Sequence, residues 1–265
     1  MIRKVLQPVD LSESPKDIKA RSLFIDRFGG QEIILFHVMN PGVDSRDQSE
    51  SRISRLEDEI KETGVNARAS LATGHVASEI VRAASDEGVD IIYMPASRKN
   101  ILVSTLMGSV TDDVIRLSDV PVFVHKQRPE LAKRKSLDKL MLATDFQKAA
   151  VRAKPYVHML GEYIPELIIL HVGQRASDPE TEQLRRENVE QGLKEIKKEF
   201  AGDYERVKHY ARIGSPARHI IETAEQEQAE LVVLGRINEP FPSKILGSTC
   251  ARVTSGVGSS VLLVP

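Results

Sequence analysis

The chain has 265 residues, of which 41% are hydrophobic and 28% charged, and its formal net charge is −1. This near-neutral balance argues against general electrostatic binding to nucleic acid or to an anionic membrane surface. A single cysteine, Cys250, is too few for an internal disulfide or a thiolate metal site, which fits a reducing compartment. The first residues enter an apolar run with no signal peptide, and no apolar segment approaches the roughly 20 residues that span a bilayer. We therefore expect a cytoplasmic protein that binds neither nucleic acid nor membrane.

Apolar runs alternate with helical patterns along the first half of the chain. Ser14 is a natural helix cap, Pro15 a natural first helical residue, and Gly29-Gly30 a natural stop. Runs with β-branched side chains, bounded by polar, glycine or proline residues, predict buried strands at 33–38, 90–95 and 120–126. Alternation of this kind indicates a parallel sheet covered by helices on both faces.

The second half of the chain repeats the first. Four blocks recur in the same order, and residues 4–15, 32–38, 73–95 and 104–126 match residues 139–150, 166–172, 213–235 and 243–265. Ser215 and Pro216 again form a cap and first helical residue, and 180–200 is expected to form an exposed amphipathic helix. The sequence therefore predicts two tandem doubly wound α/β domains, at 1–127 and 137–265, joined by a charged linker at 128–136.

Two aspartates occupy equivalent places in the halves. Asp10 and Asp145 each follow the first strand, and in doubly wound sheets the ligand crevice lies beyond the carboxyl ends of the strands. A carboxylate there can accept a hydrogen bond from a ribose or hold a metal ion beside phosphates. It can equally cap the turn into the next helix, so both interpretations stay open.

A Gly-Ser pair begins a helix near the end of each half. Gly108-Ser109 and Gly247-Ser248 are separated by 139 residues. A helix start offers unpaired N–H groups and the positive end of the helix dipole, and glycine lets an anion approach the backbone closely. The pairs suit phosphate, although Gly-Ser before a helix is more commonly a simple cap.

On these residues both halves resemble universal stress protein domains, over nearly the whole chain. The matching motifs are PVDLSESP, FHV, LMGSV and VPVFVHK in the first half, and ATDF, LHV, VVLGR, ILGST and SSVLLVP in the second. The resemblance implies five parallel strands in the order 3-2-1-4-5 in each half. Nucleotide-binding members carry a loop G-x2-G-x9-G-S/T for ATP phosphates, an aspartate after strand one, and a backbone contact to adenine after strand two.

The second half keeps most of that pattern. The resemblance assigns Asp145 to ribose or to Mg²⁺ and the backbone of Val172 to adenine. It assigns the phosphates to Gly235, Asn238, Gly247 and Ser248. Asn238 replaces a glycine, and the loop that follows is one residue shorter than in the family. Lys244 and Arg252 add positive charge nearby.

The first half departs further from the pattern. Its weaker candidates are Asp10, Val38, Gly108 and Ser109. Pro95 and Arg98 stand where the family has its first two glycines, and Pro95 has no N–H to donate. Asp112 and Asp113 fall in the first turn of the next helix, where they would repel phosphate.

Other reactive residues are interpreted as structural. His37 and His171 occupy equivalent strand positions, and each is expected to be a buried imidazole with a hydrogen-bond partner. The other histidines show no metal-binding spacing. Cys250 is interpreted as a core residue whose place in a helix first turn could lower its thiol pKa. We therefore assign no catalytic residue.

The sequence favours a stress-response binding or regulatory protein rather than an enzyme. ATP or AMP, with Mg²⁺, would act in the second domain as an occupancy signal. One alternative is a scaffold that binds an unknown protein partner with both pockets inactive. Another is a slow ATPase or adenylyl-transferring enzyme that uses Asp145 and Mg²⁺. Because family domains pair through their last strands, we also expect an internal pseudo-dimer of the halves, with further homodimerisation of the chain.

Overall fold

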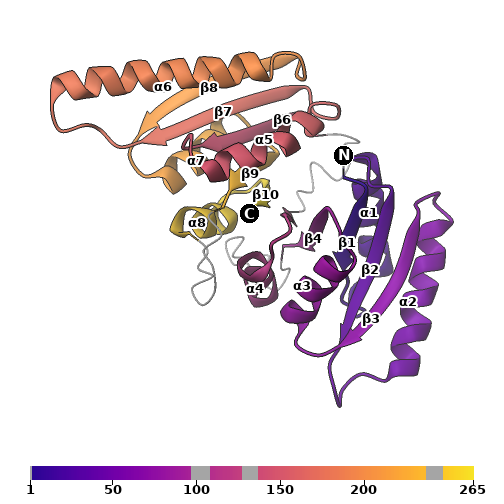
Figure 1. Ribbon diagram of the computed structural model, residues 1–265. Coiled ribbons are helices and arrows are strands. Elements are labelled where there is room, and N and C mark those ends of the chain that lie inside the picture. The colour runs from indigo at the N-terminus through magenta and orange to yellow at the C-terminus, as the bar shows by residue number, and fades with distance from the viewer. Residues whose placement is uncertain (1, 97–107, 127–136, 237–246) are drawn as a thin grey trace. The chain divides into compact units, whose positions relative to one another are not determined.

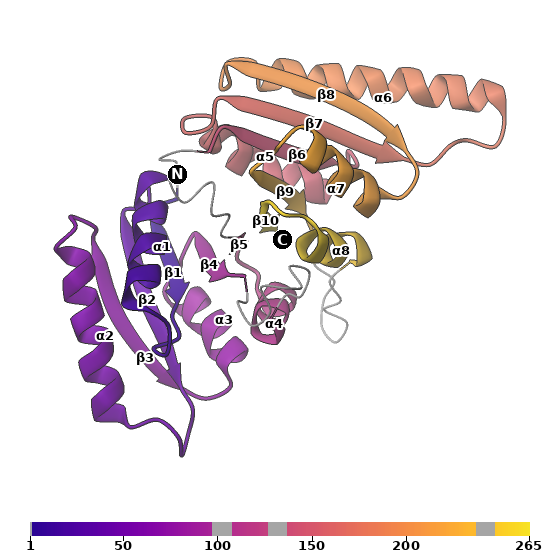
Figure 2. The ribbon, with the colours of Figure 1, turned by 180° about the vertical axis from the view of Figure 1, so that it is seen from behind.

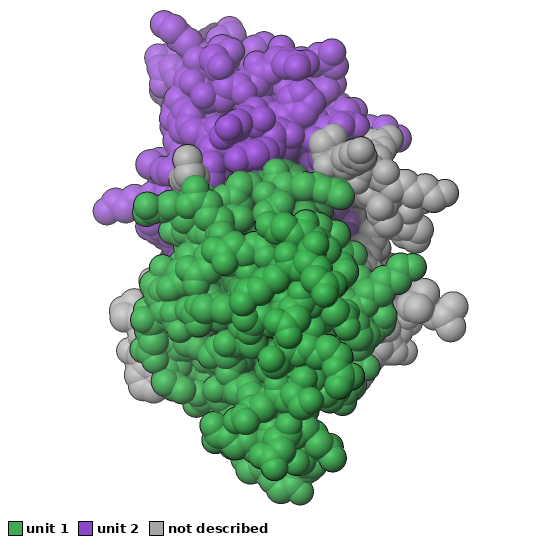
Figure 3. All heavy atoms as spheres, turned by 90° about the vertical axis from the view of Figure 1, so that its right-hand side faces the viewer, with its two compact units in different colours: residues 1–95, 108–123 green, residues 96–107, 124–265 purple. Residues whose placement is uncertain are grey.

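The computed structural model describes residues 2–96, 108–126, 137–236 and 247–265. By residue contacts the chain divides into two units, residues 1–95 with 108–123 and residues 96–107 with 124–265 (Figure 3). The predicted linker at 128–136 lies outside the described residues. The predicted pseudo-dimer and homodimer stay predictions. In the part of the chain that is described, no helix combines the length and the apolar content needed to cross a membrane.

The first half forms an open parallel sheet. Its elements are β1 (Lys4–Pro8), α1 (Pro15–Arg27), β2 (Glu32–Met39), α2 (Arg46–Lys61), β3 (Ala67–Thr73), α3 (Val76–Asp86), β4 (Ile91–Pro95), α4 (Ser109–Leu117) and β5 (Val122–His125). The strands lie in the order β3-β2-β1-β4-β5, with β1 pairing parallel to both β2 and β4. Figure 1 shows α2 beside β3, and α3 beside α4.

The second half repeats this arrangement. Its elements are β6 (Lys139–Thr144), α5 (Lys148–Leu160), β7 (Glu166–Gly173), α6 (Pro179–Glu199), β8 (Arg206–Ile213), α7 (Pro216–Gln226), β9 (Leu231–Gly235), α8 (Ser248–Gly256) and β10 (Ser260–Val264). The strands lie in the order β8-β7-β6-β9-β10. Figure 2 shows α6 running along β7 and β8. The predicted order 3-2-1-4-5 is therefore confirmed in both halves.

The helix boundaries follow from the predicted capping residues. Ser14 and Ser215 are the N-caps of α1 and α7, and the prolines after them take the first helical positions. Gly29 ends α1 with φ of 79°, a conformation that glycine adopts without strain. These start and stop signals are confirmed.

The two halves differ in how their first helix packs on the sheet. In the first half Tyr93 and Phe123 stack with ring centroids 5.2 Å apart, and Phe24 of α1 lies within 6.1 Å of both rings. The repeat puts Val233 and Leu262 in the places of Tyr93 and Phe123. Because these side chains are smaller, α5 packs closely on β9. In the first half, α1 does not pack as closely on β4.

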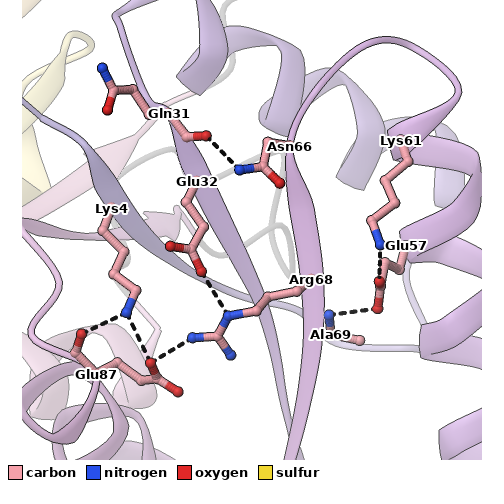
Figure 4. Close-up of polar contacts among 9 residues, drawn as sticks. All are labelled: Lys4, Gln31, Glu32, Glu57, Lys61, Asn66, Arg68, Ala69 and Glu87. Carbon is pink, nitrogen blue, oxygen red and sulfur yellow. Dashed lines mark hydrogen bonds and ion pairs between the residues drawn. The ribbon is translucent and has the colours of Figure 1, made fainter.

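A charge network joins the amino ends of the strands in the first half (Figure 4). Lys4 Nζ lies 3.0 Å from Glu87 Oε2, and Arg68 pairs with both Glu87 and Glu32. Lys4 also donates to the backbone carbonyl of Glu87 at 2.8 Å. The network fixes the residue that follows α3 to the first residues of β1 and β2.

The second half carries the same network. Lys139 donates to the carbonyl of Glu227 at 2.9 Å, as Lys4 does to Glu87. Lys208 takes the place of Arg68 and lies 2.8 Å from Glu166 and 3.0 Å from Glu227. Both halves therefore have this ion-pair network at the amino ends of their strands.

We expect Glu87→Gln to lower the free energy of unfolding at pH 7 by less than about 1 kcal/mol, because the pair is partly exposed. Hydrogen bonds from Lys4 and Arg68 lower the pKa of Glu87 from its ordinary 4.5. The stabilisation is therefore present above that value and is lost as the pH falls through the lowered pKa. Urea unfolding from pH 7 to pH 3 should show the two proteins converge in acid. A constant difference across that range would contradict the prediction, and Glu205→Gln, an exposed glutamate, is the control.

Candidate functional site

The two predicted aspartates close the turns that follow β1 and β6. Asp145 Oδ1 accepts a hydrogen bond from the N–H of Gln147 at 2.9 Å, and Asp10 Oδ1 accepts one from Ser12 at 2.8 Å. Both aspartates are exposed. Each aspartate therefore closes a short turn before the helix, whereas the N-caps of α1 and α5 are Ser14 and Gln147. A role of the aspartates toward ribose or Mg²⁺ stays a prediction. Among the residues that the structure describes, no cluster of three or more His, Cys, Asp or Glu side chains could hold a metal ion.

The N-terminus of α8 is exposed and free of acidic residues. Gly247 is its N-cap, with φ of −52° and ψ of 140°, and no side chain of the described residues caps the helix. A Cβ built at Gly247 would meet nothing within 4 Å. Ser248, the first helical residue, is exposed. The predicted Gly-Ser pair therefore begins α8, and no side chain of the described residues caps its first N–H groups.

Gly235 lies at the end of β9 against the start of α5. A Cβ added there would lie 2.1 Å from the carbonyl oxygen of Ala149 and 2.6 Å from the backbone nitrogen of Ala150. The glycine is therefore needed for close packing of α5 on the sheet, a role that the sequence analysis missed. Its predicted role toward phosphate stays a prediction.

Contacts of Cys250 place three of the residues predicted to bind the nucleotide, or the segments that carry them, near one another. Its Sγ, in the first turn of α8, lies 3.9 Å from the carbonyl oxygen of Gly235. Burial raises the pKa of the thiol to about 11. The positive charge of Arg236 opposes this rise, and the negative charge of Asp145 adds to it. The expectation of a lowered pKa was wrong, because desolvation of the thiolate outweighs the helix dipole. Asp145, Gly235 and the start of α8 thus surround one region at the carboxyl ends of β6 and β9.

The two strand histidines have local partners. His171 Nδ1 donates to the carbonyl of Thr144, and His37 Nδ1 donates to the carbonyl of Val9, each at 2.9 Å. Burial lowers the pKa of His171, which favours the neutral ring. The expected hydrogen-bond partner is confirmed for both, and His171 is buried as predicted, whereas His37 is only half-buried. The hydrogen bonds hold adjacent strand ends together.

The predicted adenine contacts lie at the ends of the second strands. Val172 is half-buried and pairs with Arg212 of β8, and Val38 is buried and pairs with Ala72 of β3. Asn238, Lys244 and Arg98 lie outside the described residues.

A cavity that the sequence analysis missed lies between Phe146 and α6. It measures about 300 Å³ and is lined by Phe146, Thr181, Leu184, Arg185, Asn188 and Val189. The lining residues of α6 follow the i, i+3, i+4, i+7, i+8 spacing of one helix face, which is the signal that could have suggested a shared surface. Phe146 adopts φ of 63°, and its ring stacks on His171 with centroids 4.6 Å apart.

Comparison with known proteins gives the family. The sequence model of the universal stress protein family matches residues 1–126 and again residues 137–265. The chain belongs to the universal stress protein family. A universal stress protein from Archaeoglobus fulgidus DSM 4304 is 24% identical, with 98% of this chain and 97% of that chain covered and a TM-score of 0.74. This likeness shows the tandem fold.

Two relatives match about half of the chain. A universal stress protein of Methanocaldococcus jannaschii is 27% identical over 157 residues, which cover 48% of this chain and 97% of the relative. A universal stress protein in complex with cAMP is 17% identical over 47% of this chain and 96% of that chain, with a TM-score of 0.38. Each of these relatives therefore corresponds in length to one half of this tandem universal stress protein.

The two halves of this universal stress protein differ at the helix start that follows the fourth strand. Gly108 is the N-cap of α4 as Gly247 is of α8, and Ser109 is exposed like Ser248. In α4, however, Asp112 lies in the first turn, and Arg116 pairs with both Asp112 and Asp113. The start of α4 therefore carries negative charge that the start of α8 lacks.

Proposed function

We propose that the second half of this universal stress protein binds an adenine nucleotide as an occupancy signal, and that the first half does not. The observation that carries the proposal is the convergence of Asp145, Gly235 and the acid-free start of α8 on one region. Such a region offers phosphate the N–H groups and the dipole of a helix terminus. No general base for nucleotide chemistry is assigned.

The residues present fit a nucleotide with Mg²⁺. The open space at Gly247 would admit a phosphate to the backbone, and the exposed hydroxyl of Ser248 would add a donor. Asp145 would hold the ribose or a Mg²⁺ ion, which when bound neutralises phosphate charge. Val172 would offer its backbone to the base.

Acidic residues in the first half support the proposal that it does not bind a nucleotide. Besides Asp112 and Asp113, it places Glu13 beside Asp10, where the repeat puts Lys148 beside Asp145 in the second half. Glu13 Oε1 lies 3.4 Å from the backbone nitrogen of Asp10 and pairs with Arg21. These carboxylates would repel a polyphosphate.

The test is calorimetric titration of the full chain with ATP and Mg²⁺. The wild type should bind saturably, and Gly247→Val should bind at least about tenfold more weakly, a loss of about 1.4 kcal/mol, because the new side chain occupies the phosphate approach. Gly247 has φ of −52°, so valine is tolerated there without backbone strain.

Gly108→Val in the first half is the matched control and should leave binding unchanged. No heat with millimolar ATP, or equal affinity in the Gly247→Val protein, would contradict the proposal. Production of ADP beyond one equivalent would instead indicate an ATPase.

A further inference from the structure

The cavity beside α6 has the chemistry of a site for a flat heteroaromatic group. Phe146 supplies an aromatic wall, Leu184 and Val189 supply apolar surface, and Asn188 offers an amide donor and acceptor. Its volume of about 300 Å³ is at the small end of ligand pockets, which suits one ring system rather than a whole nucleotide.

The walls of the cavity are held in place by local contacts. Arg185 donates to both carboxylate oxygens of Glu182 at 2.9 Å. Glu182 also accepts from the backbone N–H of Ala176 at 3.0 Å, which ties the start of α6 to the preceding loop. The Phe146 ring is fixed by His171, and a Cβ at Gly192 of α6 would lie 3.1 Å from its edge. The cavity is therefore formed before any ligand arrives.

Two residues that line the cavity, Phe146 and Arg185, lie next to residues of the proposed nucleotide site. Phe146 directly follows Asp145 in the chain. At the carboxyl end of β7, Arg185 Nη1 lies 3.3 Å from the place of a Cβ on Gly173, the residue after Val172. A ligand whose ribose lies at Asp145 would thus have its base beside this opening.

We propose that the cavity between Phe146 and α6 holds the base of the bound nucleotide, and that Leu184 and Asn188 are its specificity-determining residues. This inference rests on the proposed function. Leu184, one of the residues that line the cavity, leaves 58% of its surface exposed and so offers apolar surface of the kind that ligand pockets present. The base would cover it, and the amide of Asn188 would read the hydrogen-bonding edge of the base.

The first experiment introduces a spectroscopic reporter. The chain contains no tryptophan, so Leu184→Trp creates a single emitter at the cavity. ATP with Mg²⁺ should quench its emission saturably, with the Kd found by calorimetry, because bases stack on aromatic side chains. Inorganic tripolyphosphate, which has no base, should not quench it. Val43→Trp, at a valine 76% exposed in the first half, is the matched control and should not respond to ATP.

A second variant tests the apolar contact. Leu184→Gln should weaken ATP binding about fivefold, since it removes part of the apolar surface that the base buries. If calorimetry shows that ATP binds both variants with wild-type affinity and the emission of the introduced tryptophan does not change, the base lies elsewhere and the inference is overturned, while the proposed function stands. Equal quenching by tripolyphosphate would also overturn it. Absence of ATP binding to the wild type would overturn both.

Discussion

Gly235→Ala is expected to destabilise the second half by about 3 kcal/mol, the upper part of the usual range for overpacking. The new methyl group would lie 2.1 Å from the carbonyl oxygen of Ala149 and 2.2 Å from its carbonyl carbon. These are backbone atoms of the first turn of α5, and they cannot rotate away as a side chain can. The whole helix must therefore move away from β9, with loss of the packing between them.

Gly247→Ala is the matched control, because the resemblance gives both glycines to the same phosphate loop. A Cβ at Gly247 meets nothing within 4 Å, and its φ of −52° suits alanine. We expect this variant to keep wild-type stability. Native-state hydrogen exchange of the amides in β6, β7 and β9 measures the change, with β1 and β2 as the internal reference. Equal protection of the second-half strands in the two variants would contradict the packing role of Gly235.

The fold was predictable because its signals are local and are written twice. Pro15 and Pro216 mark helix starts through their fixed φ angle, while Ser14 and Ser215 before them take the N-cap position without a side-chain hydrogen bond. The apolar runs mark buried strands. Because the sequence repeats, an element predicted in one half is supported by the matching element in the other. The family resemblance supplied the strand order, which the structure shows.

The features that escaped prediction depend on distances between elements. The residues around Gly235 in the sequence do not indicate how closely α5 approaches β9. That distance depends on Val233 and Leu262, which stand where the first half has aromatic rings. The pKa of Cys250 follows its depth of burial rather than its place in the first turn of α8. The cavity needs the left-handed backbone of Phe146, a conformation that is uncommon for a bulky residue.

Arg21→Ala is expected to destabilise the first half by about 2–3 kcal/mol. The Arg21 side chain is only 2% exposed, and its Nη1 and Nη2 lie 2.8 and 3.1 Å from the two carboxylate oxygens of Glu13. Removal of one partner from a buried ion pair leaves the other charge poorly compensated, at a cost of about 3–5 kcal/mol. Glu13 keeps 19% of its side chain exposed, so water compensates part of its charge and the expected loss is smaller.

Two comparison variants separate the charge effect from lost packing. Arg82→Ala removes an arginine that is 60% exposed and paired with Glu79 and Asp86, and it should cost much less stability than Arg21→Ala. Arg21→Met with Glu13→Gln keeps the buried volume and removes both charges, so it should recover most of the lost stability. Hydrogen exchange of the β1 and β2 amides measures all three. If Arg21→Ala costs no more than Arg82→Ala, or if the double variant recovers nothing, the buried pair does not stabilise the turn that carries Asp10. The position of Glu13 beside Asp10 would then not depend on its ion pair with Arg21.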